Sequence, residues 1–544
     1  MSSTHEQNSS ASPSLLRCLR FPLLVLLLFG GIFAIPRICV AYDYHTEEML
    51  GFFMLTQLAI PLAALLIVLW LLFFSGLAWS TRFVVLVLAG LLGVGAYYSI
   101  REVELTTTSV GMIPRLHFIW EPTAQERLAT FEKQESAQAD ELPPIDAKVG
   151  PEDFPSYRGP DQDGVVAFAK LETDWTKAPP KKLWARPCVG GYSGIAVAGN
   201  IAVTLEQREA GEVVVCYDRA TGRQRWTFAF GTLYKDATHM GDGPRSTPTI
   251  HHQLIFGIGA TGELVCLDAH GKKQWSTNIL DDAKSKNVKW GLAGSPLIVD
   301  DLVIAHAGID PDEPAGSSLI AYEQATGKKR WQTGNRKAGY SSPQLVVLGN
   351  TPQILLFDGE GLVSYDKAGK ELWSSPWITN FDMNTIQPVV LGKDRVFLSS
   401  EKENGCALLR VKAPDTNAAA WSVETVWANK NLASRFANPV TDGKHLFGLN
   451  NMLGVLTCLD VNDGKVQWKG ERCGPGQLLL TDGALLVING DTGDVTLFGT
   501  DGTELARQRV FDKQDKTWNT PALAGDQLFV RNQSAIVCLK LPRR

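Results

Sequence analysis

The sequence predicts an all-β fold, an eight-bladed β-propeller, joined to an N-terminal three-helix transmembrane anchor. Three observations predict this architecture. A short motif that pairs a glycine with a tryptophan four residues later recurs along the chain, the composition is rich in Gly (50) and Trp (15), and three apolar runs precede residue 101. Propeller blades combine tight glycine turns with one large packing residue in each repeat, and this composition suits them.

The anchor is assigned to residues 1–122, with helices near 21–41, 51–78 and 83–100. The second run contains IPLAALLIVLWLLFFSGLAW, and the third reads FVVLVLAGLLGVGAYYSI. Runs of about 17 to 25 apolar residues are long enough to span a bilayer as a helix. The first run, FPLLVLLLFGGIFAI, is shorter and is extended by ICVAY, and the alternative for the whole region is a signal peptide followed by one helical hairpin.

Basic residues near the helix ends predict how the anchor is oriented. Arg17 and Arg20 precede the first helix and Arg82 lies between the second and third, whereas the loop between the first and second is mainly acidic. Cytoplasmic loops carry an excess of Lys and Arg. The N-terminus is therefore expected in the cytoplasm, and everything after the third helix outside it.

A linker is expected at residues 123–155, where Glu, Gln, Ala and Pro dominate, and part of it is expected to be a short helix. Such a composition suits a mobile tether. The propeller is assigned to residues 156–544.

The recurring motif predicts how each blade is built. Its clear copies are CYDRATGRQRW, CLDAHGKKQW, AYEQATGKKRW, SYDKAGKELW and CLDVNDGKVQW. An acidic side chain caps the turn and Gly supplies positive φ, and the Trp then returns on the outer strand and wedges between neighbouring blades. The docking tryptophans are Trp226, Trp275, Trp331, Trp373 and Trp468.

Eight strand starts can be counted, and each is expected to begin the inner strand of a blade. They are Ser193-Gly194, Thr247-Pro248, Ser295-Pro296, Ser342-Pro343, Gln387-Pro388, Asn438-Pro439, Gly476-Gln477 and Thr520-Pro521. The fifth unit ends at Trp421 or Trp427, and the seventh has Ala506 where Trp is expected. The eighth lacks an outer strand, which KKLWARP at 181–187 is expected to supply, so that the ring closes without open edges.

The motif resembles the tryptophan-docking repeats of the quinoprotein alcohol dehydrogenase-like superfamily and of the outer-membrane assembly propeller lipoprotein. FPSYRGPDQDGV at 154–165 and TWNTPALAGDQLFVRN at 517–532 also resemble membrane-anchored, PQQ-binding-like propeller proteins of planctomycetes and related bacteria. The resemblance implies an eight-bladed propeller. With the apolar helices and the charges at their ends, it leads us to expect a location in the bacterial inner membrane. The protein is thus expected to be multi-pass, with its propeller on the extracytoplasmic, periplasmic side.

The loops before the eight strand starts gather at one mouth of a propeller channel, and they carry Arg, aromatic and Asn residues. The candidate ligand-binding residues are Tyr192, Arg245, Trp290, Arg336, Tyr340, Asn384, Arg435, Arg472, Trp518 and Asn519. Arg offers a planar fork to anions, and Trp and Tyr offer flat faces. The alternative is that these side chains only pin the loops to one another.

These observations favour a binding or scaffold module for an envelope protein, a peptide or a glycan. The formal net charge of -5 argues against a nucleic-acid partner. The sequence assigns no catalytic or metal-ligating residue and predicts no cofactor. The alternative function, implied by the superfamily, is a dehydrogenase that uses PQQ with calcium and passes electrons to a membrane quinone, but the calcium ligands of that superfamily have no identified counterparts here.

Overall fold

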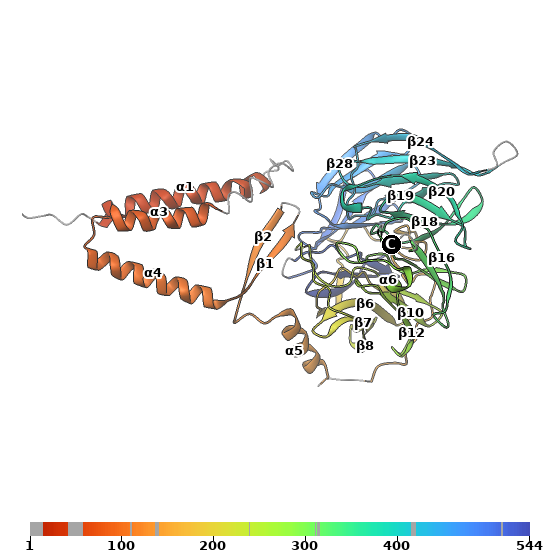
Figure 1. The fold of residues 1–544 in the computed structure, drawn as a ribbon, viewed down its shortest axis with the longest axis horizontal. Coiled ribbons are helices and arrows are strands. Elements are labelled where there is room, and N and C mark those ends of the chain that lie inside the picture. The colour runs from red at the N-terminus through yellow and green to blue at the C-terminus, as the bar shows by residue number, and fades with distance from the viewer. Residues whose placement is uncertain are drawn as a thin grey trace, which may run out of the picture. The chain divides into compact units, whose positions relative to one another are not determined.

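The computed structural model describes residues 15–41, 58–108, 111–136, 141–238, 240–310, 312, 316–414, 420–512 and 515–544. The chain divides into two compact units, Met1–Glu121 and Pro122–Arg544. Each unit has its own secondary structure (Figure 1).

The first unit contains three helices and a β-hairpin. The helices are α1 (Leu15–Ala41), α3 (Ala59–Phe73) and α4 (Trp79–Ser99), and the hairpin is β1 (Ile100–Thr108) with β2 (Gly111–Phe118). The Phe21 ring of α1 stacks on the Trp70 ring of α3 with centroids 6.0 Å apart. The hairpin was not predicted, since residues 1–122 were assigned as a whole to the transmembrane anchor.

Only α4, among the helices of the described residues, is long and apolar enough to cross a membrane. The apolar parts of the other two, Arg20–Ala34 and Ala59–Phe73, are shorter. Residues 51–57 of the expected second helix lie outside the described residues. The structure therefore supports one candidate span where the sequence predicts three.

The second unit begins with α5 (Ala124–Ser136) and contains eight four-stranded blades, one of them extended by β3 (Val165–Val166). Blade 1 comprises β5 (Ala196–Ala198), β6 (Ile201–Arg208), β7 (Gly211–Asp218) and β8 (Gln224–Gly231), and blade 2 comprises β9 (Thr249–His251), β10 (Leu254–Ile258), β11 (Glu263–Asp268) and β12 (Lys273–Asn278). Blade 3 comprises β13 (Leu297–Val299), β14 (Leu302–His306), β15 (Leu319–Glu323) and β16 (Lys329–Thr333). Blade 4 comprises β17 (Gln344–Leu348), β18 (Thr351–Asp358), β19 (Gly361–Tyr365) and β20 (Glu371–Pro376).

Blades 5 to 8 continue the same antiparallel order. Blade 5 comprises β21 (Val389–Leu391), β22 (Arg395–Ser399), β23 (Cys406–Lys412) and β24 (Ser422–Asn429), and blade 6 comprises β25 (Val440–Thr441), β26 (His445–Asn450), β27 (Val455–Asp460) and β28 (Val466–Arg472). Blade 7 comprises β29 (Gln477–Thr481), β30 (Ala484–Ile488), β31 (Val495–Gly499) and β32 (Glu504–Gln508). Blade 8 comprises β33 (Ala522–Ala524), β34 (Gln527–Arg531), β35 (Ala535–Lys540) and β4 (Lys181–Pro187). Short helices α6 (Ile279–Ala283) and η1 (Asn380–Asp382) lie in the connections. Figure 1 shows the blades following one another around the ring, from yellow-green β6 to blue β28.

Blade 8 closes the ring as the sequence predicts. Strand β4, the segment KKLWARP, pairs antiparallel with β35, and Trp184 lies opposite Cys538. The eight-bladed prediction is confirmed. Because β35 gains a partner from the start of the domain, its edge is not left open.

Four of the five docking tryptophans stack on a glycine of the following blade: Trp226, Trp275, Trp331 and Trp468. The fifth, Trp373, instead donates its indole N–H to Gln353 Oε1 of its own blade at 2.9 Å. A Cβ on Gly271, which has φ of 79°, would lie 2.6 Å from the Trp226 ring, and the Trp226 indole donates to the Ala269 carbonyl at 2.9 Å. In the fifth blade Trp427 has this role, since it lies opposite Leu408 and packs on Gly464. Glycine is thus required at this position of the motif for two reasons: the backbone has positive φ, and a side chain would clash with the indole ring.

The segment expected to be a mobile linker is docked on the propeller. In α5, Leu128 is fully buried, Glu132 pairs with Arg208 at 3.2 Å, and Glu135 lies 3.4 Å from Arg186 of β4. Further along, the Asp146 amide donates to the Asn200 side chain at 2.8 Å. These contacts hold the segment against blades 1 and 8.

Candidate functional site

A collar of hydrogen bonds joins the starts of the inner strands around the channel. The Thr247 amide donates to Ser295 Oγ at 2.9 Å, and the Ser295 amide donates to Ser342 Oγ at 2.9 Å. The Ser342 amide donates to Gln387 Oε1 at 3.0 Å, and the Gln387 amide donates to Asn438 Oδ1 at 2.6 Å. The polar residues before Pro296, Pro343, Pro388 and Pro439 therefore each satisfy a buried amide of the preceding blade, as buried backbone groups require.

A cavity of about 180 Å³ lies at the mouth above this collar. Six of the ten predicted residues line it: Tyr192, Arg245, Trp290, Tyr340, Arg435 and Trp518. Its wall also includes Tyr157, Met240, Met383 and Phe436, with smaller polar residues between them. The aromatic residues come from connections between different blades, and they face one small space.

The aromatic rings contact one another around the cavity. The Trp518 ring stacks on Phe436 with centroids 5.4 Å apart and lies 6.0 Å from Tyr192. On the other side the Trp290 ring lies 5.7 Å from Tyr340, and the Trp290 indole donates to Thr238 Oγ1 at 2.7 Å. Neighbouring rings limit each other's movement, so the cavity wall is held in shape.

Cationic side chains lie over these rings. The Arg245 guanidinium is 5.5 Å from the Tyr192 ring centre, and the Arg435 guanidinium is 5.4 Å from that of Phe436. Lys516 and Lys289 cover Trp518 and Trp290 at 5.0 and 4.8 Å. Cation–π contact positions these charges at the mouth, and Arg245 also pairs with Asp236 at 3.7 Å.

A strained turn places an apolar side chain at the rim. Phe381 and Asp382 both have positive φ, 59° and 56°. Phe381 is 66% exposed, although its ring lies 6.1 Å from Trp290. Backbone strain of this kind is concentrated at functional sites, and here it presents a large apolar ring to solvent.

The other four predicted residues lie outside the cavity lining. Arg336 binds Asp358 through two hydrogen bonds of 2.5 and 3.1 Å. Asn384 is fully buried and donates to the Asp358 carbonyl at 2.7 Å. Asn519 donates to the Gly191 and Ser193 carbonyls, and Arg472 is the last residue of β28. Arg336, Asn384 and Asn519 hold connections between blades together, which is the alternative that the sequence left open.

Tyr157 is the main cavity residue that sequence reasoning missed. It belongs to FPSYRGPDQDGV, which enters the channel from outside the repeats, and its hydroxyl accepts a hydrogen bond from Asn438 Nδ2 at 2.7 Å. Burial raises the pKa of Tyr157 above 10. The run of Tyr, Arg, Gly and Pro just before the repeats was a sequence signal that could have indicated this contribution to the channel.

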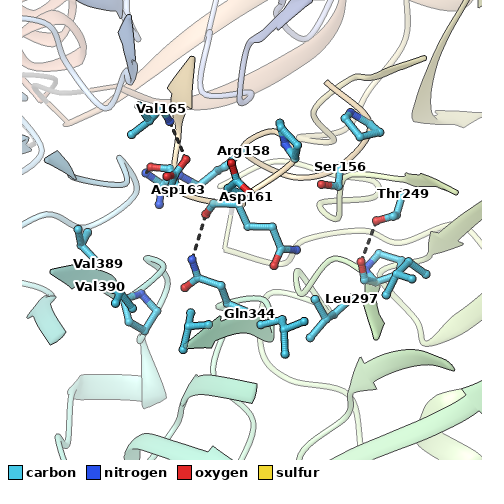
Figure 2. Close-up of a pocket in the computed structure, with 18 of the residues that line it drawn as sticks. Ser156, Arg158, Asp161, Asp163, Val165, Thr249, Leu297, Gln344, Val389 and Val390 are labelled. Carbon is cyan, nitrogen blue, oxygen red and sulfur yellow. Dashed lines mark hydrogen bonds between the residues drawn. The ribbon is translucent and has the colours of Figure 1, made fainter. Parts of the chain in front are cut away.

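A second, larger cavity of about 550 Å³ lies between the inner strands and this same entering segment. One wall is made of inner-strand residues, among them Leu297, Val389 and Val390, and the opposite wall contains Arg158, Asp161 and Asp163 (Figure 2). We call residues 154–166 the plug segment. Within it, β3 pairs in parallel with β29, the inner strand of blade 7.

Two buried carboxyl groups near the mouth have altered acidity. Glu212 is fully buried, accepts the Ala260 amide at 2.9 Å, and burial raises its pKa to about 8. Burial also raises the pKa of Asp358 to about 6, although Arg336 opposes this change. Neither carboxyl lines the mouth cavity.

The described lining of the mouth does not fit PQQ with calcium. Calcium takes six to eight oxygen ligands, many of them carboxylates, whereas the oxygen donors of this lining are hydroxyl and amide groups. The described residues contain no group of three or more His, Cys, Asp or Glu side chains placed to hold a metal ion. The cavity of about 180 Å³ is also smaller than the roughly 300–1,000 Å³ typical of small-molecule pockets.

Comparison with known proteins agrees with the repeat architecture. Residues 209–470 match a model of PQQ-type repeats described as "Outer membrane protein assembly factor BamB". The chain has a PQQ-like β-propeller repeat fold. No curated protein sequence matches the chain.

Solved structures similar to the chain include a BamB protein and two quinohemoprotein alcohol dehydrogenases. BamB from Moraxella catarrhalis is 14% identical over 67% of this chain and 98% of its own, with a TM-score of 0.45. The quinohemoprotein alcohol dehydrogenase ADHIIG from Pseudomonas putida HK5 is 11% identical over 78% of this chain and 83% of its own, with a TM-score of 0.47. The quinohemoprotein alcohol dehydrogenase from Comamonas testosteroni is 12% identical over 76% and 84%, with a TM-score of 0.40. Likeness at this level concerns the fold and not the activity.

Proposed function

We propose that this protein is a membrane-anchored binding module that holds an extended segment of an envelope protein in the mouth of its propeller. The observation that carries the proposal is the convergence of Tyr, Trp and Arg side chains on one small cavity. These three residue types dominate the binding energy of protein interfaces, especially where they surround a central pocket. Met240 and Met383 add adaptable apolar surface of the kind found at peptide-binding sites.

The rim supports a protein segment over a glycan as the occupant. Phe381 exposes an apolar ring beside Trp290 of the cavity wall. The cations above the rings would favour acidic groups on the incoming segment. The match of residues 209–470 to repeats described for an outer membrane protein assembly factor is consistent with a partner in the envelope.

The proposal includes the arrangement in the membrane that the sequence predicts. In it α4 spans the bacterial inner membrane, α1 and α3 are further membrane helices, and the propeller lies on the periplasmic side. Protease treatment of spheroplasts tests this arrangement, because a periplasmic propeller is digested when the cytoplasm remains sealed. Protection of the propeller would contradict it.

Site-specific photo-crosslinking in whole cells tests the binding function. A photoreactive amino acid at Phe381 is expected to give an adduct with an envelope protein, and the same group at Val426 on outer strand β24 serves as the control. Substitution of Trp518 by Leu or of Arg435 by Met should reduce the adduct about tenfold at a temperature at which each variant is still folded. A synthetic peptide covering the cross-linked segment should then bind the full-length chain in nanodiscs. Equal adducts from both positions, or adducts insensitive to the mouth substitutions, would refute the function.

A further inference from the structure

The cavity at the plug segment contains two buried polar atoms of opposite type that have no protein partner. Arg158 is 2% exposed, and its Nη1 has no hydrogen-bond acceptor among the described residues. Gln344 of β17 is 4% exposed, and its Oε1 has no donor there. Both side chains line the cavity. A buried polar atom without a partner costs about 1–3 kcal/mol, and such atoms call for an explanation.

The rest of each side chain is fixed in place. Arg158 Nη2 donates to the carbonyls of Asp163 and Pro439 at 2.6 and 2.8 Å, and a Cβ on Gly164 would lie 2.7 Å from that nitrogen. Gln344 Nε2 donates to the Gln162 carbonyl at 3.3 Å, and Figure 2 shows this side chain reaching from its strand toward the plug segment. The free donor and the free acceptor are therefore held on opposite walls of one space by bonds that use their other atoms.

Arg158 lacks a direct anionic partner. Its bonded groups are neutral carbonyls, and burial lowers its pKa to about 10. Asp163 is the nearest carboxyl group along the segment, but its Oδ1 accepts the Val165 amide at 2.8 Å, and burial raises its pKa. Asp161 is exposed. A buried guanidinium of this kind is stabilised by an anion that reaches it with good geometry.

The inner strands supply the apolar part of the cavity wall, which is formed by Leu297 and Ile298 of β13, Leu345 and Val346 of β17, and Val389 and Val390 of β21. Thr249, His251 and Thr441 add polar groups to the same side. The volume of about 550 Å³ lies within the roughly 300–1,000 Å³ range of ligand pockets. The site thus combines one polar end with an apolar surface.

We propose that this cavity binds a carboxylate that carries an N–H donor beside its carboxyl group and an apolar side chain. An N-acyl amino acid and the C-terminal residue of a short peptide share this chemistry. The carboxylate accepts from Arg158 Nη1, the N–H donates to Gln344 Oε1, and the side chain lies along the inner strands. This site is separate from the mouth and does not depend on what the mouth binds.

Calorimetric titration of the full-length chain in nanodiscs tests the proposal. The first probe is N-acetyl-L-leucine, and its controls are N-acetyl-L-leucinamide, which has no carboxylate, and 4-methylpentanoate, which has no N–H. Each control should bind more weakly by roughly 5- to 150-fold, since it leaves one buried atom without a partner. A second arm uses the peptide Ala-Ala-Ala-Leu. Tighter binding of the peptide than of N-acetyl-L-leucine identifies a peptide terminus as the source, and equal or weaker binding identifies a free acyl amino acid.

Two substitutions separate the site from general effects on folding. Val390→Trp fills the apolar wall and is expected to abolish binding, whereas Val426→Trp on the outer strand β24 adds the same side chain away from the cavity and should not change it. Gln344→Leu removes the acceptor and should erase the preference for N-acetyl-L-leucine over 4-methylpentanoate. The proposal is overturned if neither acid binds at millimolar concentration, if the amide binds as well as the acid, or if Val390→Trp leaves binding intact.

Discussion

Glu212 makes the stability of the propeller depend on pH in a way that one substitution should remove. Its side chain is fully buried where blade 1 meets blade 2, and both carboxyl oxygens lie within hydrogen-bond distance of the Ala260 amide. Burial raises its pKa from 4.5 to about 8, and the nearby Glu263 adds to the change. The folded protein therefore keeps this carboxyl protonated at neutral pH, where the unfolded chain has lost the proton.

The sign and size of the effect follow from this difference in pKa. A carboxyl group whose pKa is raised by folding stabilises the folded state fully below pH 4.5, and this contribution is lost as the pH rises to about 8. Each pH unit corresponds to about 1.4 kcal/mol, so the loss at pH 7 is at most about 3 kcal/mol. Small shifts of the surrounding residues and entry of water reduce this loss, and we expect about 1–3 kcal/mol of stability to be lost at pH 7.

Glu212→Gln removes the titrating group and keeps an oxygen that can accept the Ala260 amide. The variant should match the natural protein near pH 4.5 and be more stable by about 1–3 kcal/mol at pH 7. Chemical unfolding of the full-length chain in detergent, followed by tryptophan fluorescence at several pH values, measures this. Glu403→Gln, an exposed glutamate in the turn between β22 and β23, serves as the control. A difference between Glu212→Gln and the natural protein that does not change with pH would refute the reasoning.

Three further predictions test the architecture by unfolding and melting measurements. Gly271→Ala, where the new Cβ meets Trp226, should lower the free energy of unfolding by more than 2 kcal/mol, while Gly443→Ala, with φ of 87° and open space, should lower it by only about 1 kcal/mol. Trp184→Ala in the closing strand should lower it by about 3–5 kcal/mol, because Trp184 is 8% exposed, and a loss under 1 kcal/mol would contradict its docking role. Tyr157→Phe should lower the free energy of unfolding by about 1–3 kcal/mol, because the side-chain amide of Asn438 loses its acceptor. An unchanged melting temperature would show that this hydrogen bond contributes nothing.

The fold could be predicted from the sequence because its signals are local and repeated. A glycine that must have positive φ and a tryptophan at a fixed offset appear in each clear copy, and even the decayed fifth unit keeps Trp427 on its outer strand. The closing strand was recognisable because KKLWARP matches the part missing from the eighth unit. Periodicity supplies several independent observations of one building unit.

The candidate site was predicted only in part, because side-chain direction in loops is not periodic. Trp290 and Arg336 both precede inner strands, yet Trp290 lines the mouth, whereas Arg336 turns to Asp358 within its own blade. Tyr157 and Arg158 line the two cavities but precede the repeats. The spacing of the repeats therefore could not predict that they lie in the channel. The docking of α5 depends on long-range pairs such as Glu132 with Arg208, which composition does not reveal.

The closure of blade 8 has a consequence for biosynthesis. Strand β4 leaves the ribosome roughly 350 residues before β35, which at about 5–20 residues per second is an interval of roughly 20–70 s. Blade 1 emerges soon after β4 and offers it contacts at once: the Trp184 ring packs on Gly222, and Arg186 Nη1 donates to the Gly222 carbonyl. The first blade to be made can therefore hold the waiting strand in position, so that the last hairpin finds its edge already in register.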